Sequence, residues 1–336
     1  MTRTIATIIV LVMMMVTPAA LTAYSKEPVT YTVLFAFIPE NPSSSGFTMG
    51  APRWIPGNGQ DAEVIQEIET PYYNCEIVKW TIENPIERFE DAPLSTQPTS
   101  LYNYTNPIVV EFIRNNISKL NLNNLSNEEK INRIADYIYK HFKYQVGQYP
   151  HYPWETIKLG HGDCDDLAIL VVTIARAYHV PSAVATGLLV IPGLKSSIMA
   201  GGINYTVEGI AGHAWIVYKN NKGKPVVMDR LVPLDAVPNE RRIVLDFPVN
   251  GYQYVNQTRT EVMQQKGKAY IMLYNGKTCP SPQELENPPN TTSKSETQVN
   301  ISDKQAIIAL GILGWILVTL IYYIYANITR PAWSRW

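Results

Sequence analysis

The clearest pattern in the chain is an apolar segment that directly follows a glycine-rich turn. From Leu167 to Ala175 nearly every residue is apolar, without alternation between two faces. A helix that is apolar all round is expected in the centre of a domain. The pattern therefore predicts a buried helix over 164–179, with Asp163 as its N-cap and Asp166 in its first turn.

Helices are expected before this segment and strands after it. Apolar residues at helical spacing predict helices over 107–120 and 126–142, the second opened by a capping box from Ser126 and Glu129. This order predicts an α+β domain over 101–280 with an antiparallel sheet. The runs that predict its strands are 183–191, 213–218, 225–229, 242–247 and 269–274.

The region before this domain, 24–100, is rich in proline, serine and turn residues. Alternating apolar stretches at 31–38 and 75–82 predict short strands and thus a β-rich extension. A glycine-rich insertion at 192–210 is expected to form either a lid or a surface loop.

The N-terminus carries a short apolar run. Arg3 precedes apolar residues from Ile5 to Val16, and small residues follow up to Ala23. A run of this length with a small-residue exit is typical of a secretory signal peptide, here 1–23. An uncleaved signal anchor is the alternative.

The C-terminal run from Ala306 to Ala326 contains no charged residue and is long enough to span a bilayer. It predicts a transmembrane helix over 305–326, with the lipid bilayer as its partner; a buried helix of a soluble domain is the alternative. Arg330 and Arg335 follow it, which places a tail of 327–336 in the cytoplasm and the rest outside the cell. The polar segment 281–304 is expected to be a stalk.

An exterior location changes how the asparagines and cysteines are interpreted. Exported proteins tend to pair their cysteines, and Cys75 and Cys279 flank the motif region, so we expect them to form a disulfide. Cys164 is then the free thiol. The candidate glycosylation sites, each in an Asn-X-Ser/Thr triplet, are Asn103, Asn116, Asn124, Asn204, Asn256, Asn290 and Asn300.

Cys164 is the candidate nucleophile because it opens the apolar helix. A helix N-terminus favours the thiolate, and we expect the pKa of Cys164 to lie below the ordinary thiol value of about 8.5. A buried, inert cysteine is the alternative.

The chain has five histidines, and His213 is the candidate base. A hairpin with a loop over 219–223 places Tyr218 opposite Lys224 and His213 opposite Asp229. A carboxylate there would fix the tautomer of the imidazole. Asp235 is the fallback partner. Among the other histidines, His179 lies at the far end of the helix, His141 resembles an ordinary surface residue, and His151 and His161 precede Cys164 without a visible orienting group.

Three motifs in order resemble the transglutaminase-like superfamily. They are Gly162-Asp163-Cys164-Asp165-Asp166, Gly212-His213-Ala214-Trp215 and Val226-Val227-Met228-Asp229, within about 126–233. The resemblance implies a papain-like fold in which Cys164 is the nucleophile, His213 the base and Asp229 the orienting acid. The backbone N–H of Cys164 is one expected donor to the oxyanion of the reaction intermediate. Trp154 is placed similarly to the second, upstream donor of some members.

The chain shows no calcium-loop pattern and no zinc-ligand spacing, so we expect no metal and no cofactor. A net charge of −1 gives no reason to expect a nucleic-acid partner. The predicted function is that of a membrane-anchored extracellular cysteine enzyme that attacks peptide or glutamine-type amides through a thioester. We favour a peptidase acting on extracellular proteins or peptides, with cross-linking left open. The alternative is a catalytically inactive binding or structural glycoprotein of the cell surface.

Overall fold

The computed structural model describes residues 27–41, 60–83, 89, 92–147, 149–200, 202–260 and 266–287. The expected signal peptide, membrane helix and cytoplasmic tail lie outside these residues, as do the candidate glycosylation sites Asn290 and Asn300. Within the described ranges, no helix is both long enough and apolar enough to cross a membrane.

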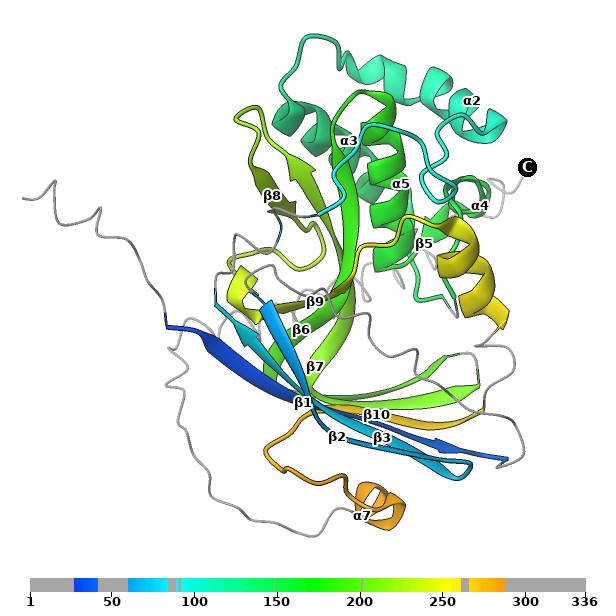
Figure 1. The fold of residues 1–336 in the computed structure, drawn as a ribbon. Helices are drawn as coiled ribbons and strands as arrows, with labels where there is room; N and C mark the ends of the chain where they lie inside the picture. The colour runs from blue at the N-terminus through cyan, green and yellow to red at the C-terminus, as the bar shows by residue number, and fades with distance from the viewer. Residues whose placement is uncertain are drawn as a thin grey trace, which may run out of the picture. The chain divides into compact units, whose positions relative to one another are not determined.

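The described residues form a mixed α/β fold around one curled sheet of eight strands (Figure 1). The strand order is β2-β3-β1-β10-β7-β6-β9, and β8 also pairs with β7. The strands are β1 (Val29–Pro39), β2 (Gln60–Thr70), β3 (Tyr73–Ile82), β6 (Ser182–Ala200), β7 (Ile203–Lys219), β8 (Pro225–Met228), β9 (Arg242–Asp246) and β10 (Gly267–Leu273).

This sheet corrects two expectations. It is not wholly antiparallel, because β10 runs parallel to β7. The N-terminal strands β1, β2 and β3 also belong to the same sheet as the later strands, since β1 pairs with β10. The sheet therefore continues across residue 100, and β2 is a strand that the sequence pattern did not predict.

The insertion at 192–210 is largely strand rather than lid or loop. β6 and β7 continue through it as a long antiparallel pair, with an irregularity between Val190 and Lys195. The far part of β7, from Ile203 to Glu208, then pairs with β10. Since β10 also pairs with β1, the insertion connects the strands that carry the site to the N-terminal strands through β10.

Helix α5 (Cys164–Ala177) is buried as predicted: Ile169 to Val172 are fully inaccessible to solvent. It packs against the preceding helix α3 and against β6 and β7. The predicted helix over 107–120 is interrupted at Asn116, and α4 was not expected. The remaining helices of this layer are α2 (Pro107–Asn115), η3 (Ile117–Leu120), α3 (Asn127–His141) and α4 (Pro153–Leu159).

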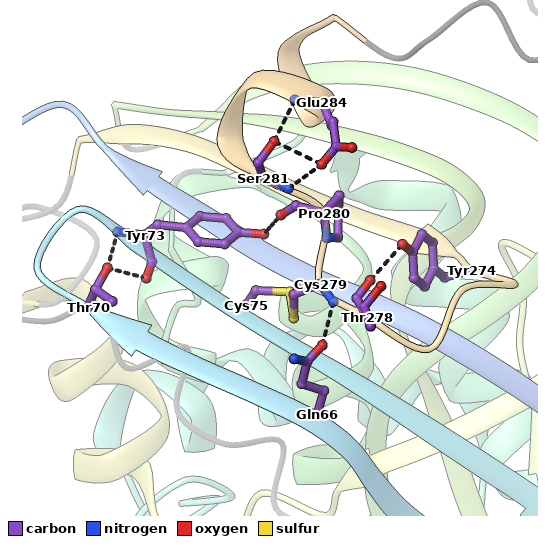
Figure 2. The surroundings of a disulfide bond; sticks show 10 residues. All are labelled: Gln66, Thr70, Tyr73, Cys75, Tyr274, Thr278, Cys279, Pro280, Ser281 and Glu284. Atoms are coloured by element: carbon purple, nitrogen blue, oxygen red, sulfur yellow. Dashed lines mark hydrogen bonds between the residues drawn. A yellow bond between two sulfur atoms is a disulfide. The ribbon is translucent and has the colours of Figure 1, made fainter.

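Cys75 on β3 is joined to Cys279 by a disulfide (Figure 2). Around it, the hydroxyl of Tyr73 donates to the carbonyl of Pro280, and the N–H of Cys279 donates to Gln66 on β2. The first residues of the expected stalk form the short helix α7 (Pro282–Glu286). The segment leading out of the fold is therefore fixed to the N-terminal strands.

Candidate active site

The turn before α5 places Cys164 at the first position of the helix. Asp163 is the N-cap, and its N–H donates to the carboxylate of Asp166 in the first turn. Gly162 permits this close turn, since a Cβ at that position would lie 2.5 Å from the Cβ of Asp166. Cys164 is partly exposed and is the free cysteine of the described residues.

The predicted histidine–aspartate pair is present in the structure. Nε2 of His213 lies 2.9 Å from Oδ2 of Asp229, and both side chains are nearly buried. This contact leaves Nδ1 of His213 for another partner. The carboxylate that His213 contacts is therefore Asp229 and not the fallback partner Asp235.

The register of the hairpin differs from the prediction. Tyr218 pairs with Val226 rather than with Lys224, and the strand β8 ends one residue before Asp229. The shift is by two residues, and side chains alternate between faces with a period of two. Asp229 therefore stays on the same face as His213 despite the wrong register.

The sulfur of Cys164 lies against the strand that carries His213. The backbone N–H of Ala214, the next residue along β7, is near enough to this sulfur to favour the thiolate. The tip of α5 thus lies beside the part of β7 that carries His213, and Asp229, directly after β8, contacts His213.

The expectation of a lowered thiol pKa is wrong. Burial raises the pKa of Cys164 well above its ordinary value, and the carboxylates of Asp165 and Asp163 raise it further. These effects outweigh the N–H donors of Ala214 and Asp165 that favour the thiolate. The resting form is therefore the thiol, so attack on an amide requires a base that takes its proton.

The two acids beside the sulfur form a close pair. Asp163, Cys164 and Asp165 each offer one ligand atom, and these atoms lie within 4.8 Å of one another. The hydroxyl of Tyr254 donates to Oδ2 of Asp165 over 2.8 Å. Burial, together with the hydrogen bond and charge of Asp163, raises the pKa of Asp165 well above its usual range. The three atoms are close enough to hold a metal ion; the expectation of no metal remains a prediction.

The raised pKa of Asp165 gives a testable dependence of stability on pH. The folded protein binds this proton more tightly than the unfolded chain, so its contribution is complete below the ordinary pKa of about 3.9 and is lost as the pH rises through the folded-state pKa. Asp165→Asn removes the titration. We expect the difference in Tm between the variant and the wild type to grow in favour of the variant above pH 4. Parallel curves of Tm against pH would contradict this.

His151 has an orienting group that the sequence pattern does not reveal. Its backbone N–H and its Nδ1 lie 2.6 and 2.9 Å from the two oxygens of Asp166, which is fully buried. The hydrogen bond to Asp166 raises the pKa of His151. This pair fixes the loop before α4 to the first turn of α5, and it makes His151 the rival of His213 as a base.

Trp154, the candidate oxyanion donor, lies on α4. Its ring stacks on that of Tyr152 at a centroid distance of 4.3 Å. Its catalytic role stays a prediction.

Three tyrosines near Cys164 were also missed. They are Tyr139 on α3, Tyr144 on β4 (Lys143–Tyr144) and Tyr254 on η5 (Tyr252–Gln257). Burial raises the pKa of each, and the charge of Cys164 contributes in all three cases. Tyr144 pairs with Gly162 on β5 (His161–Gly162), two residues before the nucleophile. The chain has 21 tyrosines, so no sequence signal separated these three from the rest.

Residues 116–229 match the family model of the transglutaminase-like superfamily. The chain contains a transglutaminase-like domain. The matched segment includes Cys164 and His213 and ends at Asp229. This confirms the resemblance that the three motifs suggested.

Two solved structures are similar to the chain. One is a candidate cysteine protease from Cytophaga hutchinsonii, with 14% identity, a TM-score of 0.39, and coverage of 74% of this chain and 84% of that one. The other is a candidate protease from Parabacteroides distasonis, with 14% identity, a TM-score of 0.31, and coverage of 67% and 45%. A search of curated proteins found no significant match.

Proposed function

We propose that this transglutaminase-like domain is a cysteine peptidase in which Cys164, His213 and Asp229 act together. The observation that carries the proposal is the contact of His213 with Asp229 at 2.9 Å, one residue before Ala214, whose backbone N–H lies near the Cys164 sulfur. A nucleophile beside a base that a third group orients is the arrangement that acyl transfer requires.

The chemistry follows from these groups. The sulfur of Cys164 bonds to the carbonyl carbon of the substrate, and the thiol proton passes to Nδ1 of His213. The carbon–nitrogen bond then breaks, and the amine leaves with the proton that His213 returns. Water, deprotonated by His213, attacks the thioester; the carbon–sulfur bond breaks and Cys164 regains its proton. Asp229 accepts the Nε2–H throughout and stabilises the imidazolium.

An extracellular, membrane-anchored location is part of the proposal. The apolar run 306–326 and the disulfide between Cys75 and Cys279 support it, because structural disulfides persist in oxidising compartments. Of the candidate glycosylation sites, Asn124 has an exposed side chain suited to a glycan. Asn116 is less suited, since its amide donates to the carbonyl of Phe112 and accepts from the hydroxyl of Tyr137.

The second candidate function is an inactive binding module. The observation that favours it is the raised pKa of Cys164, which leaves the thiol protonated at neutral pH. A catalytic role for the thiol depends on His213 taking its proton at the moment of attack.

The test uses the full chain, an unfolded protein substrate and a fluorescent primary amine in one reaction. A peptidase produces new amino termini without incorporating the amine. A cross-linking enzyme incorporates the amine and releases ammonia. Cys164→Ala is the blank, and activity that persists in it would overturn the proposal. An accessible, folded sample with neither product and with no labelling of Cys164 by iodoacetamide would establish the inactive module.

A further inference from the structure

Arg242 makes a buried contact with the proposed catalytic pair. Its Nη1 lies 2.7 Å from Oδ2 of Asp229, the same oxygen that His213 contacts. We propose that Arg242 is a positioning residue that controls the protonation of His213 by sharing this oxygen of Asp229. The inference rests on the proposed function and concerns the regulation of the same site.

The carboxylate of Asp229 is held from both sides. Oδ2 accepts from His213 and Arg242, whereas Oδ1 accepts the N–H groups of Leu231 and Val232 at 3.0 and 2.9 Å. These four contacts fix the plane of the carboxylate against the imidazole. Loss of Arg242 would remove the charged donor while leaving the two backbone donors in place.

Arg242 is itself rigidly placed. Its side chain is fully buried at the start of β9, and it donates to the carbonyls of Val237 and Val232. Its guanidinium lies 5.4 Å from the ring centre of Trp215, which is two residues from His213 on β7. A planar guanidinium whose other N–H groups are held in this way can direct one N–H at one oxygen.

The charge of Arg242 has a specific consequence for the base. Burial raises the pKa of Asp229, but the hydrogen bond and charge of His213, with Arg242 contributing, lower it below its usual range. Arg242 thus helps to keep the carboxylate ionised. It also offsets part of the negative charge that His213 faces, because both side chains contact the same oxygen of Asp229. An imidazolium could not accept the thiol proton of Cys164.

Other titratable groups face this pair. Cys164 approaches from α5 and Tyr139 from α3; burial raises the pKa of Tyr139, and the charges of Asp229 and Cys164 raise it further. Arg230 lies in the same loop, but its guanidinium contacts Asp136 and Asn132 on α3. Arg242 is therefore the cation that contacts the carboxylate directly among the described residues.

The experiment measures the rate of Cys164 alkylation by iodoacetamide against pH, using the full chain and detection by mass. In the wild type, the alkylation rate is expected to rise with pH once His213 can accept the thiol proton. This rise is the acid limb of the curve. Arg242→Gln is expected to move this limb upward by about one pH unit, because the unshared carboxylate stabilises the imidazolium. Arg242→Lys, which keeps the cation with fewer donors, is expected to move it in the same direction by less. Arg230→Gln is the matched control and is expected to leave the limb in place.

The outcomes separate this inference from the proposed function. Rates that fall in parallel at every pH, with the limb unmoved in both Arg242 variants, would show a structural role only and overturn the inference. So would a shift of the same size in Arg230→Gln, or a failure of both Arg242 variants to fold. If the wild-type limb is unchanged by His213→Ala, the proposed function itself fails and the inference fails with it. Arg242→Lys decides the case if Arg242→Gln does not fold.

Discussion

Replacing His213 with alanine is expected to lower the rate of peptide hydrolysis by about 10⁴-fold, at the upper end for the loss of a general acid–base group. The reason is the raised pKa of Cys164, which makes the nucleophile dependent on a base. An enzyme whose thiolate formed unaided would lose less. The measurement is the steady-state rate on a substrate identified in the product assay, with folding checked by circular dichroism.

Two other histidines serve as controls. His151→Ala removes the rival base, which contacts Asp166, and is expected to lower the rate by less than about tenfold. His179→Asn lies at the far end of α5, where φ is 62°, a conformation that asparagine tolerates. It should leave the rate unchanged. A large loss in His151→Ala with an intact rate in His213→Ala would assign the base to His151 instead.

The local parts of the fold and site could be predicted from the sequence. The helix α5 follows from its continuous apolar run and from capping by Asp163, both of which depend on adjacent residues. The pairing of His213 with Asp229 follows from one hairpin. The predicted register of this hairpin was wrong because Lys219, which was expected in the loop, pairs with Pro225. The loop therefore begins at Asn220, whose side-chain oxygen accepts the N–H groups of Lys222 and Lys224. Because side chains on a strand alternate between the two faces, a register error of two residues leaves Asp229 on the same face as His213.

The distant parts could not be predicted. The parallel pairing of β10 with β7 and the contact of Arg242 with Asp229 join segments whose approach depends on the whole sheet. The pKa of Cys164 was predicted in the wrong direction for the same reason. The helix N-terminus is visible in the sequence, but the burial that dominates the pKa comes from elements packed around it.

The double variant Cys75→Ala/Cys279→Ser is expected to lose about 2–5 kcal/mol of the free energy of unfolding. The disulfide joins residues 204 apart in the sequence, so it strongly restricts the unfolded chain. It also holds Cys279 and Pro280 against β2 and β3 through Gln66 and Tyr73 (Figure 2). Urea unfolding with a tryptophan fluorescence signal measures the loss. Equal midpoints for the variant and the wild type would contradict it.

Reductant distinguishes this structural disulfide from the proposed nucleophile. Cys164 is partly exposed, whereas Cys75 is only 3% exposed. A mild reductant should therefore return oxidised Cys164 to the thiol before it opens the disulfide. In the wild type, increasing reductant is therefore expected first to raise activity and then to lower Tm. The double variant should show only the first effect, because it has no disulfide to open, and Cys164→Ser should show only the second. A Tm of the wild type that is insensitive to strong reductant, in a sample whose disulfide is shown by mass to be reduced, would mean that the bond does not stabilise the fold.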